Sequence, residues 1–132
     1  MDIEQRTNPG VKAILGYDII EGISIEEYEK WIWDVHAPDL LTNPFLDRLV
    51  FNTVIRPIAA TSSGSETASD AKTFYRIAEL HFKDLEAYDR YLEWFQTNPI
   101  PPERGPAGRT AFGFYVLTDS VQAAGIGPPD TT

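Results

Sequence analysis

The chain has 132 residues, of which 42% are hydrophobic and 23% are charged, a composition typical of one soluble globular domain. Its net charge of −9, with only 11 scattered basic residues, argues against binding to nucleic acid or to an anionic membrane surface. Because there is no cysteine, disulfides, thiolate nucleophiles and cysteine-based metal sites are excluded. The polar N-terminus lacks the apolar stretch of a signal peptide, so we expect a cytoplasmic protein.

The first predicted elements are a strand and a helix. Residues 1–10 are polar and end in Pro-Gly, and we expect them to form a flexible arm. Residues 11–20 are short, apolar and bounded by glycines, which favours a buried strand. Ser24 and Glu27 then have the spacing of a capping box, which predicts the start of a helix. The apolar stripe of that helix comprises Ile25, Tyr28, Ile32 and Val35.

The remaining elements repeat this order. Residues 46–56 and 73–82 are predicted strands, and Asp84 caps a second helix that leads to a last strand over 112–118. Residues 58–72 are rich in Ser, Thr, Ala and Gly, so we expect a mobile loop inside a single domain that spans 11–120. Residues 121–132 have the composition of a disordered tail.

The two predicted helices are copies of each other until one of them diverges. Residues 25–32 and 85–92 match in residue type, and both lead on to Thr-Asn-Pro, but the first copy takes five more residues to reach it. The extra stretch contains His36, which projects only about 20° from Ile25 on a helical wheel and therefore points toward the body of the protein. The second copy has Gln96 at the corresponding wheel position. The divergence makes His36 the first candidate for chemistry.

The order of elements predicts an α+β protein with a ferredoxin-like βαββαβ fold. Its four strands form an antiparallel sheet, and both helices cover one face. The opposite face would then expose an apolar surface too large for a monomer, with candidates Phe51, Tyr75, Ile77, Tyr115 and Leu117. We therefore expect two sheets to pack face to face in a homodimer that encloses an apolar cavity.

Three segments carry a family resemblance. The string EEYEKWIWDVHAPDLL, followed by LDRLVFNTV and YRIAELHFKDLEAY, resembles the EthD-like family of dimeric α+β barrel proteins, over roughly residues 12–119. The resemblance implies a homodimer with a pocket in each subunit and no metal or organic cofactor. Relatives include lactone isomerases and small decarboxylases or dehydratases that act on aromatic polyketides. The helix histidine of the family falls on His36, and its strand glutamate falls on Glu79.

Both residues have a catalytic and a structural interpretation. An imidazole beside a cavity can transfer protons near neutral pH, but His36 can equally bond a nearby carbonyl at the helix end. Glu79 lies in the middle of a predicted strand, on the face opposite the residues that pack against the helices. In an apolar cavity it would act as an acid or orient an imidazole, whereas at a subunit interface it would form an ion pair with Arg76 or Arg56 of the partner.

The other candidates concern substrate binding. Tyr17 and Asn52 offer a hydroxyl and an amide that can hold a phenol or carbonyl, and His81 is expected at the cavity rim. Phe51, Tyr75 and Tyr115 are candidates for its aromatic lining. Arg104 and Arg109 either bind a substrate carboxylate or remain solvated. The two histidines lack metal-ligand spacing, and no glycine-rich nucleotide motif joins a strand to a helix, so we expect neither a metal nor a cofactor.

These features predict a cofactor-independent enzyme of small-molecule metabolism. In this hypothesis an aromatic or polyketide-like substrate undergoes dehydration, decarboxylation, cyclisation or rearrangement, with His36 as the acid/base. Two alternatives remain open. A non-catalytic dimer could carry an apolar metabolite in the same cavity, or a cofactor-free monooxygenase could use dioxygen on an electron-rich phenol.

Overall fold

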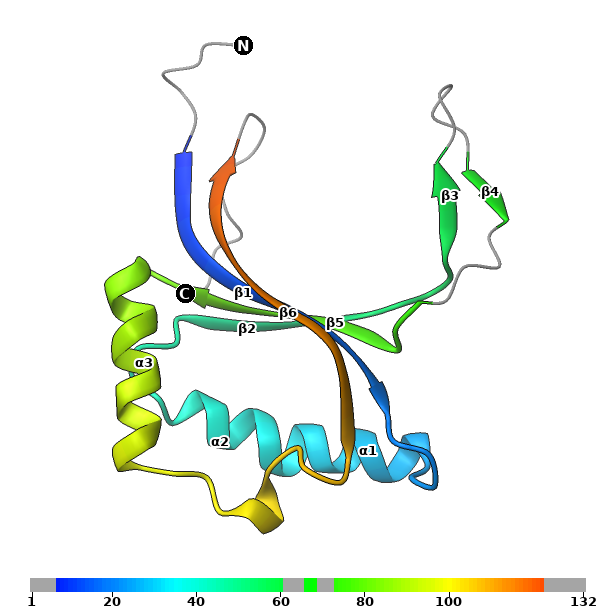
Figure 1. Cartoon of the computed structure of the whole chain (residues 1–132), viewed down its shortest axis with the longest axis horizontal. Helices are drawn as coiled ribbons and strands as arrows, with labels where there is room; N and C mark the ends of the chain where they lie inside the picture. Colours follow the sequence, from blue (N-terminus) through cyan, green and yellow to red (C-terminus); the bar gives the residue numbers. More distant parts are fainter. Residues whose placement is uncertain (1–6, 61–65, 69–72, 123–132) are drawn as a thin grey trace.

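The computed structural model describes residues 7–60, 66–68 and 73–122. Four strands form one antiparallel sheet in the order β2–β5–β1–β6 (Figure 1). They are β1 (Thr7–Ile19), β2 (Arg48–Thr53), β5 (Arg76–Phe82) and β6 (Thr110–Gln122). This is the predicted ferredoxin-like fold, in which the first and third strands occupy the centre of the sheet.

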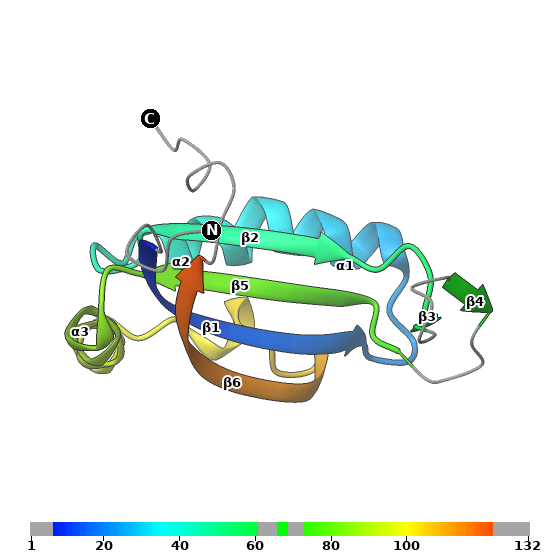
Figure 2. The same ribbon diagram turned by 90° about the horizontal axis from the view of Figure 1, so that it is seen from above.

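The helices lie on one side of this sheet. α1 (Ile25–Trp31) continues through a π-helical turn, Ile32–His36, into α2 (Ala37–Leu41), and α3 (Leu85–Thr97) follows β5. Both predicted caps are present, because the Ser24 side chain accepts a hydrogen bond from the backbone N–H of Glu27 and the Asp84 side chain accepts one from Ala87. Figures 1 and 2 show α1 and α2 running along the sheet, whereas α3 covers one end of it. None of the helices in the described ranges is long and apolar enough to cross a membrane.

The core lies between the helices and the covered face of the sheet. Its strand residues alternate along β1 and β5, as expected for a sheet with one covered face, and comprise Val11, Ala13, Leu15, Tyr17, Ala78, Leu80 and Phe82. The helices contribute Tyr28, Trp31 and Ile32 from the first helical segment and Tyr91 from α3. Ile25 was predicted to belong to this buried stripe, but it is 60% exposed, because it occupies the first position of α1, beyond the covered area.

The prediction for the open face of the sheet is largely wrong. Phe51 pairs with Ala78, Tyr115 with Leu15 and Leu117 with Ala13, and all three partners are buried beneath the helices. Paired residues of an antiparallel sheet project from the same face, so Phe51, Tyr115 and Leu117 also point toward the helices. Of the five predicted residues, Ile77 alone lies on the open face, since it alternates with the buried Arg76 and Ala78.

A bulge explains part of this error. The register of β1 and β6 shifts between Gly16 and Tyr17, which pair with Phe114 and Phe112 respectively. Gly113 is therefore an extra residue in β6, and it reverses the inward and outward alternation of every later residue in that strand. Phe74 and Tyr75 precede β5, outside its regular alternation. The ring of Phe74 contacts Phe114, and the hydroxyl of Tyr75 instead reaches Glu29 of α1.

The predicted mobile loop at 58–72 contains a short antiparallel hairpin. β3 (Ile58–Ala60) pairs with β4 (Glu66–Ala68), while residues 61–65 and 69–72 lie outside the described part of the chain. β1 starts at Thr7 and β6 ends at Gln122, so each strand extends into a segment that was predicted as a flexible arm (1–10) or a disordered tail (121–132). The rest of both segments lies outside the described residues. The hairpin and the paired ends of β1 and β6 project on the side of the sheet away from the helices (Figure 1).

Candidate functional site

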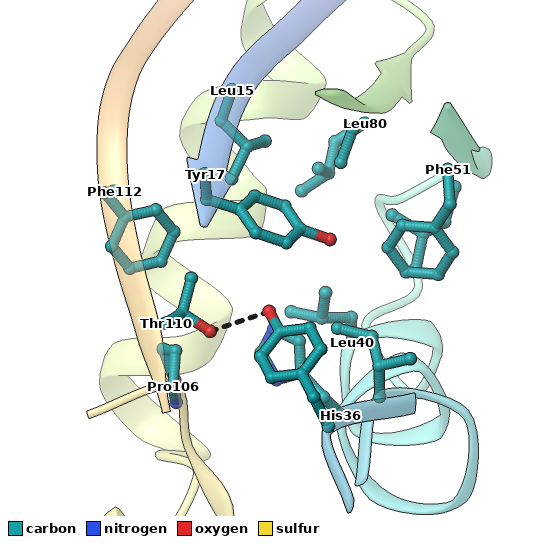
Figure 3. A pocket seen from close by; sticks show the side chains of 13 residues that line it. Leu15, Tyr17, His36, Leu40, Phe51, Leu80, Pro106, Thr110 and Phe112 are labelled. Carbon is teal, nitrogen blue, oxygen red and sulfur yellow. Dashed lines mark hydrogen bonds between the residues drawn. The ribbon is translucent and has the colours of Figure 1, made fainter. Parts of the chain in front are cut away.

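A pocket lies between the covered face of the sheet and the helical segment α1–α2 (Figure 3). Its lining is mostly apolar and includes Leu15, Phe51 and Leu80 from the strands and Ile32 and Leu40 from the helical segment. The free space is about 30 Å³, enough for about one or two water molecules. A ligand the size of an aromatic ring can therefore enter only if side chains move apart.

The rim of the pocket is formed by the start of β6 and the segment before it. Phe112 lines the pocket and is also 52% exposed, so its ring lies between the pocket and solvent. Pro106 and Thr110 complete this wall. The segment that carries Pro106 is attached to the helices, because Arg104 donates two hydrogen bonds of 2.9 Å to the carboxylate of Asp39. Arg104 therefore forms a structural ion pair with Asp39. The second predicted arginine, Arg109, lies over Trp31, with its guanidinium carbon 5.2 Å from the ring centroid.

His36 points into the pocket from the helical side, which agrees with the predicted inward direction of its side chain. Its ring stacks on that of Trp31, with centroids 4.7 Å apart and an interplanar angle of 16°. Nδ1 is buried and has no hydrogen-bond partner within the described residues. Burial lowers the pKa of His36 to about 4, although the nearby charge of Asp39 acts in the opposite direction. The imidazole is therefore neutral at pH 7 and able to accept a proton.

The π-helical turn accounts for the position of this ring. The backbone N–H of Ala37 donates to the carbonyl of Ile32, five residues earlier, in place of the usual four. In a regular α-helix Trp31 and His36 would be rotated from each other by about 140° and could not stack. The wider turn aligns residues five positions apart and so places His36 beside Trp31. The five residues that the first helical copy has in excess thus belong to a distorted segment that presents the histidine.

Besides His36, three side chains with hydroxyl groups line the pocket, namely Tyr17, Tyr28 and Thr110. The hydroxyls of Tyr28 and Thr110 form a buried hydrogen bond of 2.8 Å with each other. Tyr17 enters from β1, as predicted, and within the described ranges its hydroxyl makes no hydrogen bond of good geometry (Figure 3). Burial raises the pKa of both Tyr17 and Tyr28 above the ordinary value, so both phenols remain protonated near neutral pH.

Arg76 is a functional candidate that the sequence analysis considered only as an ion-pair partner of Glu79 at a subunit interface, whereas it pairs with Glu29 on the covered face of the sheet. It lies at the start of β5 on the helix-covered face and is only 3% exposed. Its Nη2 donates to Glu29 Oε1 at 2.6 Å and to Thr53 Oγ1 at 2.8 Å, and its guanidinium carbon lies 5.2 Å from the ring centroid of Phe51. A signal was present, because Arg76 alternates with Ala78 and Leu80, and an arginine at a core position of a strand marks an unusual environment.

The remaining predicted polar residues lie on the other face of the sheet. Ala78 and Leu80 point into the pocket, so Glu79 between them points away from it. Glu79 accepts hydrogen bonds from Asn52 at 2.8 Å and from His81 Nε2 at 3.1 Å, and Lys12 lies 3.4 Å from the same carboxylate. The expectation that Glu79, Asn52 and His81 share a cavity with His36 is therefore wrong, because the sheet separates them.

This open-face cluster has a defined protonation state. Arg48 can only donate, so its contact of 3.2 Å with His81 Nδ1 assigns the imidazole proton to Nε2, which faces Glu79. Burial and the positive charges of Arg48 and Lys12 lower the pKa of His81. Partial burial raises the pKa of Glu79, but the hydrogen bond from Asn52 and the charge of Lys12 outweigh that effect, so its pKa lies below the usual value. The cluster is a structural network and leaves no free acid for the pocket.

The two predicted tyrosines of the cavity lining lie near its edge or outside it. The hydroxyl of Tyr75 donates to Glu29, next to Arg76, and its ring packs edge-on against Tyr28 at a centroid distance of 6.3 Å. Tyr115 is 51% exposed and lies toward Tyr88 of α3. Tyr115 does not line the pocket.

No protein-family model and no curated protein sequence matches the chain at a significant level. Solved structures share its fold. HapK from Hahella chejuensis has a TM-score of 0.58 at 12% identity, over 90% of this chain and 99% of HapK. An EthD-like protein from Ralstonia eutropha has a TM-score of 0.53 at 13% identity, over 83% of this chain and 89% of its own length. The chain has the ferredoxin-like fold of the EthD-like proteins.

A third structure with this fold is a dimeric protein of unknown function from Bacteroides fragilis. Its TM-score is 0.50 at 12% identity, over 83% of this chain and 95% of the other. The TM-scores show that the ferredoxin-like fold is shared, and at such low identities the reaction must be argued from the residues of the pocket.

Proposed function

We propose that this chain is a cofactor-independent cytoplasmic enzyme that converts an apolar, aromatic or polyketide-like small molecule, with His36 as the general base. The observation that carries the proposal is a neutral imidazole in an apolar pocket, whose buried Nδ1 has no partner among the described residues. A structural histidine at a helix end would be expected to bond a carbonyl there. The reaction would be a lyase or isomerase step, such as dehydration, decarboxylation, cyclisation or rearrangement.

The pocket supports such a reaction without a cofactor. Proton transfer by a positioned side chain contributes roughly 10²- to 10⁴-fold to the rate of a reaction. An enclosed apolar pocket that holds the reacting groups together contributes further through orientation. The small free volume implies that substrate binding opens the rim at Phe112 and that the pocket closes again around the substrate.

The proposed assembly is a homodimer through the open face of the sheet. That face carries aliphatic and aromatic side chains around the Glu79 cluster, namely Ile14, Val50, Phe74, Ile77, Phe114 and Val116. The structurally similar protein from Bacteroides fragilis is described as dimeric, which supports this arrangement. Each subunit would retain its own pocket, because the pocket lies on the opposite side of the sheet.

The test is turnover by matched histidine variants. Purified protein is incubated with a panel of phenolic β-keto acids and β-hydroxy ketones, and mass spectrometry follows loss of water, loss of carbon dioxide or isomerisation. His36→Asn should lower kcat by roughly 10²-fold or more. His81→Asn is the matched control, since the second histidine of the chain lies outside the pocket, and it should keep the wild-type rate. Because His81 belongs to the cluster on the proposed dimer face, the assembly state of this variant is measured in parallel.

The same experiment separates an enzyme from a carrier. A carrier uses the apolar lining but not the proton chemistry, so it would retain the ligand and show no turnover in either wild type or variant. Unchanged turnover by His36→Asn, with the pocket intact, would refute the catalytic role of His36.

A further inference from the structure

Two buried donors lie side by side on the covered face of the sheet. Tyr17 and Arg76 are direct partners in the antiparallel pairing of β1 and β5, and each is only 3% exposed. Directly opposed side chains of such a pair are neighbours on one face. Within the part of the chain that the structure describes, neither the Tyr17 hydroxyl nor Arg76 Nη1 makes a hydrogen bond of good geometry, although the hydroxyl lies close to the Arg76 guanidinium and to Tyr28, which both affect its pKa. Buried polar groups are rarely left without one, so this pair requires an explanation.

Two of the three nitrogens of the Arg76 guanidinium donate hydrogen bonds that hold the group in place. Its Nη2 and Nε donate to Thr53 Oγ1 at 2.8 and 3.1 Å, and Nη2 also donates to Glu29. Partial burial raises the pKa of Glu29, but hydrogen bonds from Tyr75 and Arg76 outweigh this, so the carboxylate is ionised and balances the arginine. The remaining nitrogen, Nη1, is buried, and the guanidinium packs on the ring of Phe51, which lines the pocket, although Arg76 itself does not line it.

We propose that Tyr17 and Arg76 form a binding site for a substrate oxygen that gains negative charge, and that the substrate is therefore an enolisable ketone or a phenol. The inference rests on the proposed function and names its substrate class. The Tyr17 hydroxyl stays protonated because burial raises its pKa, so it serves as a donor. Two preorganised donors in an apolar, largely closed pocket stabilise an oxyanion much better than water-exposed donors do.

The chemical step follows from the two walls of the pocket. His36 on the helical wall accepts a proton from the carbon next to the substrate carbonyl, and that C–H bond breaks. Its electron pair forms a carbon–carbon double bond, while the π pair of the carbonyl moves onto oxygen. The resulting enolate oxygen accepts hydrogen bonds from Tyr17 and Arg76. The proton on His36 is later returned to the leaving group or to another carbon, so the step needs no oxidant or reductant.

The test uses a spectroscopic ligand pair in the full chain. 4-Nitrophenol ionises to a coloured phenolate, whereas 4-nitroanisole has the same shape without an ionisable oxygen. Wild type should bind the phenolate form preferentially and lower the apparent pKa of bound 4-nitrophenol, as read from its absorbance. Tyr17→Phe should weaken phenolate binding by roughly 10- to 100-fold, the usual effect of a hydrogen bond to a charged group, and should leave 4-nitroanisole binding nearly unchanged.

Two further variants complete the design. Arg76→Lys keeps the charge beside Glu29 but cannot place a donor at the Nη1 position, so it should also reduce the preference for phenolate. Tyr91→Phe is the matched control, because Tyr91 is a buried tyrosine of α3 that lies outside the pocket, and the variant should bind both probes as wild type does.

The outcomes separate this inference from the proposed function. If wild type shows no preference for the phenolate, or if Tyr17→Phe binds both probes as wild type does, the oxyanion site is refuted while a catalytic His36 can still stand. If phenolate binding depends on Tyr17 but His36→Asn retains turnover, the oxyanion site stands and the proposed general base fails.

Discussion

At the scale of single residues, His36 couples the pocket to pH. Its pKa is lowered by burial to about 4 in the folded protein, against about 6.5 in an unfolded chain. Between these values the unfolded state binds the proton more tightly, so stability falls as the pH decreases from about 6.5 toward 4 and then changes no further. Above pH 6.5 the residue is neutral in both states and has no effect on the pH dependence.

This gives a measurable difference between wild type and His36→Asn. From pH 7 to pH 5, wild type should lose about 2 kcal/mol more of its free energy of unfolding than the variant does. Urea denaturation of both proteins at the two pH values provides the measurement. Other titrating groups, including Glu29 and His81, cancel in this comparison because both proteins contain them. Equal losses in the two proteins would mean that the folded state does not disfavour the charged imidazole.

The kinetic consequence has the same sign. A general base must be unprotonated, so kcat should be nearly constant from pH 7 to pH 5 and decrease as the pH falls through about 4. A catalytic role for the protonated imidazole would instead give activity that rises in this range. The pH–rate profile of any substrate found in the panel distinguishes the two, provided that circular dichroism confirms the fold at each pH.

The sequence correctly predicted that His36 points inward, but it did not predict the helix geometry around this residue. A regular helical wheel aligns His36 with Ile25, but Ile25 is exposed and the histidine reaches the pocket through a π-helical turn. The inward direction was therefore right, although the assumed helix geometry was not. Arg76 was within reach of the same reasoning, because strand alternation places it on the covered face. The alternation of side chains along β5 cannot predict the partners of Arg76, because Glu29 and Thr53 belong to other elements.

At the scale of elements, the π-helical turn should control access of the histidine to the pocket. Inserting one alanine after Asp34 would put His36 six residues after Trp31, a spacing that one wide turn cannot align, and would rotate the histidine away by more than about 100°. The pKa of His36, measured by NMR, should then rise from about 4 toward about 6.5, because the ring is no longer buried. Deleting Asp34 is the contrast, because it places His36 four residues after Trp31, on the same face of a regular α-helix, and should leave the pKa low. A low pKa in the insertion variant would show that burial of the ring does not depend on its spacing from Trp31.

The β6 bulge gives a second prediction for an element. Gly113 is covered by the ring of Phe74, so that a Cβ added there would overlap the ring. Gly113→Ala should destabilise the protein by about 1–3 kcal/mol through overpacking. The same change in a Phe74→Ala background should cost much less, because the obstructing ring is absent. Urea denaturation of the four proteins of this cycle measures the coupling, and purely additive effects would contradict the contact.

This bulge also marks the limit of reading faces from sequence. The order of strands and helices followed from composition, capping residues and periodicity, which are local properties. The faces of Tyr115 and Leu117 did not, because one extra residue at Gly113 reverses the alternation and its place depends on pairing with Gly16 and Tyr17 of a distant strand. A glycine inside an aromatic strand is the one local hint of such a bulge.

At the scale of the whole molecule, the open face of the sheet is the surface through which the proposed homodimer would form. The sheet divides the protein into a helical side that holds the pocket and an open side with the Glu79 cluster and an apolar surround. The sequence predicted that such a face exists and that it needs cover, but it assigned most of the wrong residues to it. The corrected face surrounds the Glu79 cluster with aliphatic and aromatic groups, and burial of that cluster in a dimer requires its hydrogen bonds to be retained.

The proposed homodimer can be tested on this face with a pair of matched substitutions. Val116 lies on the open face and is 48% exposed, whereas Leu41 is 55% exposed at the end of α2 on the helical side. Val116→Glu would place an unpaired charge in the interface and should weaken the dimer by roughly tenfold or more. Leu41→Glu introduces the same charge where no partner is proposed and should leave assembly unchanged.

Sedimentation velocity at micromolar concentration provides the measurement. Wild type and Leu41→Glu should sediment with about twice the mass of the 14.8 kDa chain, and Val116→Glu should shift toward the mass of one chain. A wild type of single-chain mass would rule out the dimer, and equal dissociation of both variants would place the interface elsewhere. Because the pocket lies behind the sheet, dissociated Val116→Glu should still bind 4-nitrophenolate through Tyr17, so that loss of assembly and loss of the site are measured separately.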